Sequence, residues 1–298
     1  MDNVTSIVNT IGVNQAVNPA NLKTNLYFPV ESQPIQAYDD PTNSVIDGGE
    51  GFQAIVRTDT QKILAVHKQD YHLVRNEDIY PKYEDALKRS RLDLTDMRVE
   101  DEIAFDGGRS IRTYHFPAHQ VEIGKAGSND MVDLQLRVLN SYDGAYAFKS
   151  IVGAYRLICS NGMVIGNKFA ETYGKHTTGI DIDKAIRKVN GAVEIFLNNV
   201  EMWQGWSSTQ ITDVEATRII KALPGINERL EETLFGYWTI EHLKAGRTKW
   251  AMFQALTFWS THATVRGTSK ENSSSIILNR EGRVRSVLAP LELIKEAA

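Results

Sequence analysis

The middle of the chain combines cationic and aromatic side chains in a pattern that suits a single-stranded nucleic acid. Residues 149–188 contain seven bases and three acids, a balance of +4, with tyrosines interleaved among them. Lysine and arginine neutralise phosphates, and bases stack on tyrosine rings. Ordinary surface charge and sheet packing are the competing interpretation of the same side chains. The nucleic-acid-binding residues that the pattern predicts are Arg137, Lys149, Tyr155, Arg156, Lys168 and Lys175.

The role of Arg156 depends on how regular its strand is. Lys149 and Arg156 are seven residues apart, so a regular strand places their side chains on opposite faces. A bulge at Gly153 would shift the alternation and bring both side chains to one face. Without that bulge, Arg156 is a buried or ion-paired structural arginine.

Motifs for catalysis are missing from the sequence. It contains no G-x-x-x-x-G-K-[ST] phosphate-binding loop, no G-x-S-x-G and no H-E-x-x-H. We therefore expect no catalytic residues, no cofactor and no metal site. Glu122 and Lys125 have the residue order of a metal-dependent nuclease motif, but they are one residue too far apart to share a strand face. The single cysteine, Cys159, excludes a disulfide within the chain and indicates a reducing compartment.

The elements that would position these side chains begin with an antiparallel meander. Three Asp-Gly or Asn-Gly pairs between residues 106 and 162 tolerate the positive φ of tight hairpins. In residues 131–139, valines and leucines alternate with Asp133, Gln135 and Arg137. This period of two predicts a strand with one buried face and one polar face.

Helices are predicted before and after the meander. Asn76 has the character of an N-cap for a helix that runs to about Arg91. From Ile182 to Trp203, apolar residues are spaced alternately four and three apart, which predicts a long amphipathic helix. Packing of this helix on the apolar face of the meander is favoured over a self-associating coiled coil. We therefore expect an α+β fold, in which an antiparallel β-meander packs on this helix and the C-terminal half is helical.

Charge and composition divide the chain into three units. Residues 1–51 form an acidic, Pro/Asn-rich extended arm, residues 52–179 a β-rich unit and residues 180–298 a mainly helical unit. No stretch approaches the roughly 18 apolar residues of a membrane span, and the N-terminal region lacks the apolar core of a signal peptide. The sequence therefore predicts a cytoplasmic protein that is not bound to a membrane.

Residues 140–148 and 153–164 carry a resemblance to a known family. The runs Asn-Ser-Tyr-Asp-Gly-Ala-Tyr-Ala-Phe and Gly-Ala-Tyr-Arg-Leu-Ile-Cys-Ser-Asn-Gly-Met-Val resemble the signature of a phage- and plasmid-borne family, catalogued as a domain of unknown function and called phage/plasmid-like protein. The likeness extends from about Phe52 into the helical half. It implies a mobile element and the host cell cytoplasm, and it carries over no catalytic residue. The order of meander and helix is also similar to the core of phage single-strand annealing proteins, which implies rings or filaments on single-stranded DNA.

Three functions are compatible with the sequence. The first is a non-catalytic protein that binds or anneals single-stranded DNA in recombination or replication of a phage or plasmid, as a homo-oligomer. The second is a protein-interaction factor of a mobile element, which inhibits a host defence enzyme or belongs to the virion and has a host or phage protein as partner. The third is a metal-dependent nuclease.

Overall fold

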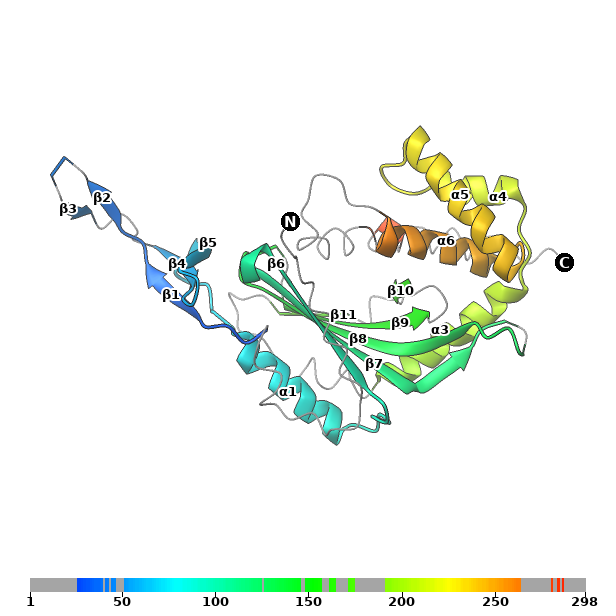
Figure 1. Cartoon of the computed structure of the whole chain (residues 1–298), viewed down its shortest axis with the longest axis horizontal. Coiled ribbons are helices and arrows are strands. Elements are labelled where there is room, and N and C mark those ends of the chain that lie inside the picture. The colour runs from blue at the N-terminus through cyan, green and yellow to red at the C-terminus, as the bar shows by residue number, and fades with distance from the viewer. Residues whose placement is uncertain are drawn as a thin grey trace, which may run out of the picture.

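The fold combines one large antiparallel sheet, a group of helices at one end of it and a narrow β arm that leaves from the other end (Figure 1). The computed structural model describes residues 26–39, 41–42, 44–46, 51–124, 126–145, 148–156, 161–164, 171–174, 191–263, 280, 283–284 and 286. The predicted α+β class with a helical C-terminal half is confirmed.

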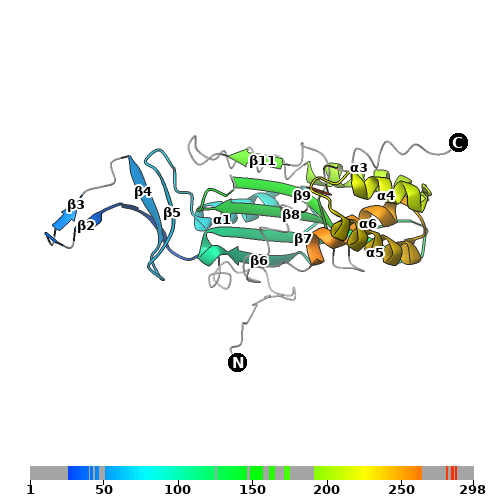
Figure 2. The same cartoon turned by 90° about the horizontal axis from the view of Figure 1, so that it is seen from above.

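The large sheet is the predicted antiparallel meander, but Asn161 and Gly162, which were expected in a turn, are the first residues of strand β10. Its strands are β6 (Arg98–Ala104), β7 (Arg109–Glu122), β8 (Met131–Ser141), β9 (Phe148–Arg156), β10 (Asn161–Val164) and β11 (Glu171–Gly174). The strand order is β10-β9-β8-β7-β6. Strand β11 pairs with the same edge of β9 as β10 does, but with residues 148–151, whereas β10 pairs with residues 153–156. All these pairs are antiparallel, and β6 to β9 lie side by side when the sheet is seen from above (Figure 2).

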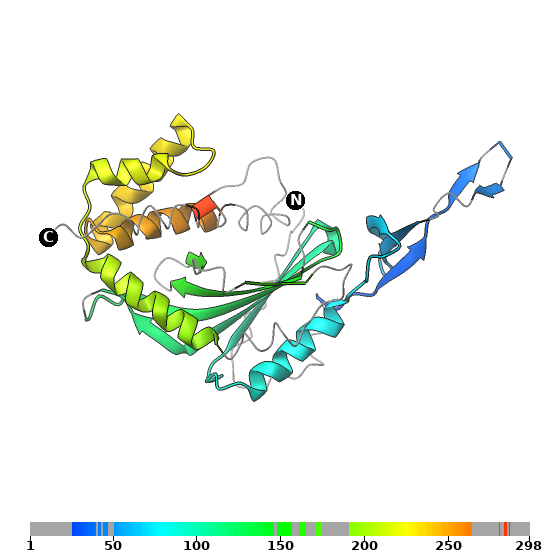
Figure 3. The same ribbon diagram turned by 180° about the vertical axis from the view of Figure 1, so that it is seen from behind.

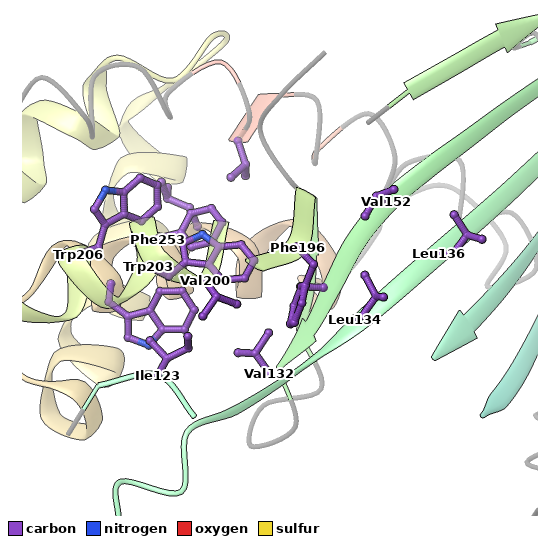
Figure 4. Packing of buried hydrophobic residues seen from close by; sticks show 14 of the residues in the cluster. Ile123, Val132, Leu134, Leu136, Val152, Phe196, Val200, Trp203, Trp206 and Phe253 are labelled. Carbon is purple, nitrogen blue, oxygen red and sulfur yellow. The ribbon is translucent and has the colours of Figure 1, made fainter. Parts of the chain in front are cut away.

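One face of the sheet is apolar and is covered by two helices, α1 (Asn76–Arg89) and α3 (Ala192–Ser208). Figures 1 and 3 show both helices along the same side of the sheet. Phe196 and Trp203 of α3 lie near Val132, Leu134 and Val152 of the sheet (Figure 4). The predicted packing of the 4-3 stripe on the meander is confirmed from Ala192 onward, and the part of the stripe before residue 191 lies outside the described residues.

Helix α1 begins one residue earlier than predicted, because its N-cap is Arg75. Asn76 is buried inside the first turn, where its side chain donates to the carbonyl of Leu26 at 2.8 Å and accepts from Ser110 and Asn140 at 3.0 Å. The polar side chain that looked like a local cap therefore joins three separate parts of the chain.

The remaining helices are α4 (Asp213–Lys221), α5 (Glu228–Ala245) and α6 (Lys249–His262). Helix α6 is apolar on most of its surface, and it is buried for that reason. Its Trp250 and Phe253 pack on Trp203 of α3, with ring centroids 5.8 and 6.3 Å apart. Sheet and helices therefore contribute to one large hydrophobic core, which extends across the predicted boundary at residue 180. None of the described helices is long and apolar enough to cross a membrane.

The β arm differs from the predicted acidic arm of residues 1–51. It consists of β1 (Val30–Pro34), β4 (Phe52–Arg57) and β5 (Lys62–Lys68), with β2 (Ala37–Asp39) and β3 (Ser44–Ile46) beyond them (Figure 1). Strands β4 and β5 pair as an antiparallel hairpin whose turn is formed by residues 58–61. Val30, Ile55, Tyr71 and Tyr142 form a small core where the arm meets the large sheet. Strand β1 thus joins a sheet with residues from the other side of the predicted boundary at residue 51.

Candidate nucleic-acid interface on the polar face of the sheet

On the face of the sheet opposite α1 and α3, polar side chains from four strands lie beside a small buried apolar cluster of Ile111, Leu139 and Ile151. Strand β8 contributes Asp133, Gln135 and Arg137, whose neighbours Leu134 and Leu136 belong to the core. Directly paired residues of adjacent strands share a face, and the register therefore places further side chains beside them. These are Arg98 and Glu100 of β6, Thr113 and His115 of β7, and Lys149 and Tyr155 of β9. We call these nine residues the polar face.

The centre of the polar face is buried, which the alternation of residues 131–139 did not indicate. Asp133 is 0% exposed, His115 2%, Gln135 5% and Arg137 7%. The polarity of this face was predicted correctly, whereas its burial is a property of the tertiary structure. Burial makes every unmatched charge or hydrogen bond on this face costly.

Acidic side chains face basic ones across the strands. Arg98 Nη2 lies 3.6 Å from Asp133 Oδ2, and His115 Nε2 lies 3.4 Å from Glu100 Oε2. The ring of His115 meets that of Tyr155 edge to face, with centroids 4.8 Å apart. Burial raises the pKa of Asp133 to about 6, although the charges of His115 and Arg98 act in the opposite direction. The adjacent His115 lowers the pKa of Glu100.

Several buried polar atoms of this face have no hydrogen-bond partner among the described residues. They are both carboxylate oxygens of Asp133, Oε1 of Gln135 and both ring nitrogens of His115. Most buried polar atoms in folded proteins are paired, and an unpaired group calls for a specific explanation such as a bound ligand or water. The polar face therefore holds unused hydrogen-bonding capacity in addition to its cations.

The structure brings three of the predicted binding residues together. Arg137, Lys149 and Tyr155 all belong to the polar face, on the neighbouring strands β8 and β9. Lys168 and Lys175 lie outside the described residues. Arg98, His115, Asp133 and Gln135 were not among the predicted site residues, because a single sequence shows the alternation along a strand but not the neighbours across it.

Arg156 lies on the opposite face. The register between β8 and β9 is regular through Gly153, without a bulge, so Lys149 and Arg156 point to opposite sides. Arg156 is 1% exposed, and its guanidinium donates to both carboxylate oxygens of Asp130 at 2.5 and 2.7 Å and to Glu241 Oε2 at 2.9 Å. Of the two interpretations of Arg156, the structure supports the ion-paired structural arginine.

The carboxylates offer little support for metal chemistry in the described part of the chain. No group of three or more histidine, cysteine, aspartate or glutamate side chains is placed there to hold a metal ion. Glu122 accepts hydrogen bonds from the backbone N–H of Asn129 at 2.8 Å and from Ser128 Oγ at 3.2 Å. Those contacts lower its pKa and close the loop between β7 and β8, which is a structural role.

The fold and its polar face define an α+β protein with an antiparallel sheet that is covered by helices on one side and lined by polar side chains on the other. The chain belongs to a family described as a domain of unknown function (DUF932), which matches residues 63–282. The matched region begins in β5 and contains the whole polar face. The comparison with solved structures found no match.

The raised pKa of Asp133 leads to a prediction for stability. When the pKa of a carboxyl group is higher in the folded protein than in the unfolded chain, here about 6 against an ordinary 3.8, the free energy of unfolding falls as the pH rises from about 4 to above 6. Asp133→Asn removes the buried charge and should raise the free energy of unfolding at pH 7.5 by about 1–3 kcal/mol. Urea unfolding at pH 7.5 and pH 5 measures this, and the gain should be smaller at pH 5. An equal gain at both pH values would contradict the assignment.

Proposed function

We propose that this protein binds single-stranded DNA on the polar face and promotes annealing, as a homo-oligomer that serves recombination or replication of a phage or plasmid in the cytoplasm of its host. The observation that supports this most directly is that Arg137, Lys149 and Tyr155 share one face of two adjacent strands. These residue types are the ones that a single-strand binder needs, namely cations for the phosphates and an aromatic ring for the bases.

The spacing on β9 suits an extended ligand. Lys149 and Tyr155 are six residues apart on one strand, which corresponds to about 20 Å at the usual rise of a β-strand. Arg137 of β8 pairs with Ile151 of β9 and therefore lies between them along the sheet. A phosphate at Lys149 and a base at Tyr155, both half-buried, would thus lie on one track, and the buried Arg137 would add its charge from between them.

Charge reversal tests this proposal. The triple variant Lys149→Glu, Lys168→Glu, Lys175→Glu should lose binding to single-stranded DNA in a gel shift at low salt. Binding should weaken steeply with salt in the unchanged protein, and removing one lysine–phosphate interaction should reduce the slope of log K against log[salt] by about 0.7. Thermal unfolding should stay nearly unchanged, because Lys149 is not part of the hydrophobic core.

The matched control reverses three exposed lysines on α1 and α4, Lys82, Lys88 and Lys221. It has the same net charge as the test variant and should keep its DNA affinity. Equal losses in both variants would contradict a specific interface. If the unchanged protein shifts no DNA, the proposal fails, and if it cleaves DNA with Mg²⁺, the protein is a nuclease instead.

A protein-interaction function is the second candidate, and the arm favours it. Phe52, Ile63 and Val66 of β4 and β5 are 48%, 65% and 54% exposed. Clustered exposed apolar side chains are typical of protein-contact surfaces. If the unchanged protein shifts no DNA in the gel, an interaction with a host or phage protein is the better proposal for its function.

A further inference from the structure

The three-stranded sheet of the arm has two faces, and one of them is attached to the body of the protein. Gln53 and Ile55 alternate along β4 onto the attached face, and His67 joins them because it pairs with Gln53. Ile55 packs in the small core with Tyr71 and Tyr142, and His67 Nε2 lies 2.7 Å from the carbonyl oxygen of Tyr142. The opposite face of the same strands therefore points away from this attachment.

The opposite face is apolar across its centre. Strand β4 contributes Phe52, Ala54 and Val56 to it. The register places Val66 of β5 beside Ala54 and Ile63 beside Val56. Phe52, Ile63 and Val66 are exposed, so these side chains form one continuous apolar patch at the surface. We call these five residues the outer arm face. Patches of this kind commonly mark contacts with another protein.

Two opposite charges lie at diagonal corners of the outer arm face. Glu31 of β1 pairs with Val56, toward one end of β4, and Lys68 of β5 pairs with Phe52, at the other end. Both side chains are exposed. The surface is therefore acidic at one corner, apolar in the middle and basic at the opposite corner.

This pattern is complementary to a second copy of itself. A two-fold axis that passes between two copies near Ala54 exchanges the two corners, so that Glu31 of each copy faces Lys68 of the other. The strands then cross at a steep angle, as in the orthogonal packing of two sheets. Two-fold dimers are built in this way, with one patch in contact with the same patch of the other copy. The arm extends beyond the large sheet at the end away from the helices (Figure 1), where a second arm can approach it.

We infer that the outer arm face joins two copies of this chain, an inference that rests on the proposed homo-oligomer and names its contact surface. Burial of Phe52, Ile63 and Val66 supplies the affinity. The two ion pairs between Glu31 and Lys68 fix the orientation of the copies. The contact uses none of the nine residues of the polar face, so pairing of the copies and binding of DNA are measured separately.

Sedimentation equilibrium without DNA, over a wide range of protein concentration, tests this contact. We expect the unchanged protein to associate and Val66→Glu to weaken the association by about tenfold or more, because it buries an unpaired charge. Leu243→Glu is the matched control, since Leu243 is an apolar residue of α5 that is 77% exposed and lies outside the arm. The control should associate as the unchanged protein does, and thermal unfolding of both variants checks that they fold.

Exchange of the two charges tests the orientation of the copies. Glu31→Lys and Lys68→Glu each place like charges against one another twice and should weaken association by about tenfold. An equimolar mixture of these two variants should associate like the unchanged protein, because every charge then meets its opposite.

Association that survives Val66→Glu, or a mixture of the two charge variants that stays as weak as either one, would overturn the arm contact alone. An unchanged protein that remains monomeric at every concentration would overturn both the arm contact and the proposed homo-oligomer. In each case the gel shift still decides whether the protein binds DNA.

Discussion

Replacing Arg156 with methionine is expected to lower the free energy of unfolding by about 3–5 kcal/mol, because breaking a buried ion pair leaves charges without compensation. The guanidinium joins the end of β9 to Asp130, in the loop before β8, and to Glu241 on α5. Trp250 of α6 also donates to Asp130, at 2.8 Å. One arginine thus connects the sheet with two of the helices at its end.

The electrostatics of this cluster agree with that role. Burial on its own lowers the pKa of Arg156, but Asp130 and Glu241 more than offset this and raise it above the ordinary value. Burial raises the pKa of Glu241, whereas Lys244 and Arg156 outweigh that effect and lower it. Without Arg156, Asp130 and Glu241 would remain buried with their negative charges only partly matched.

Urea unfolding of Arg156→Met measures this loss. Lys88→Met is the matched control, because Lys88 pairs with Asp85 at 3.5 Å on the exposed surface of α1. The control should change stability by no more than about 0.5 kcal/mol. If Arg156→Met were as mild as the control, the structural role of Arg156 would be wrong. Under conditions where the variant stays folded, its DNA affinity should equal that of the unchanged protein.

The second large effect is expected for Arg112, which occupies the covered face at the other end of the sheet. Its guanidinium donates to both oxygens of Asp101 at 2.7 Å, to Glu84 Oε1 of α1 at 2.6 Å and to the hydroxyl of Tyr27 at 2.8 Å. Arg112→Met should lower the free energy of unfolding by about 3–5 kcal/mol, since two carboxylates lose their cation.

The pH dependence distinguishes this loss from a simple packing defect. Burial already raises the pKa of Glu84, and Arg112 opposes that shift. Without Arg112 the pKa of Glu84 should rise further. A raised carboxyl pKa in the folded state makes the free energy of unfolding fall as the pH increases through that pKa. The deficit of Arg112→Met should therefore be smaller at pH 5 than at pH 8. A deficit that is independent of pH would indicate a packing defect alone, and Lys221→Met, at an exposed ion pair, serves as control.

The two arginines show how the covered face is stabilised. Each projects from a strand, lies almost fully buried and reaches a glutamate on a helix, Glu84 on α1 or Glu241 on α5. These contacts set where the helices sit relative to the sheet. The sequence leaves open whether a polar side chain of the sheet serves binding or structure, and the face on which it lies distinguishes the two. Arg156 lies on the covered face and has a structural role.

Local patterns in the sequence determined the elements of this protein. The Asp-Gly pairs predicted the hairpins because few other residue pairs adopt the required positive φ, as Gly107 and Gly144 do. The alternation in residues 131–139 predicted β8, and the 4-3 spacing up to Trp203 predicted α3, because a period depends only on neighbours along the chain. The apolar face and the helix that covers it follow from the same rule.

Only the tertiary structure decided what the polar side chains do. Whether Arg156 faced a groove or a helix depended on a bulge at Gly153 that the regular pairing with β8 excludes. Whether Asp133 was solvated or buried, and whether Asn76 capped a helix or joined Leu26, Ser110 and Asn140, depended on residues that are distant in the sequence. Burial and hydrogen bonding are set by long-range neighbours, and no period along the chain records them.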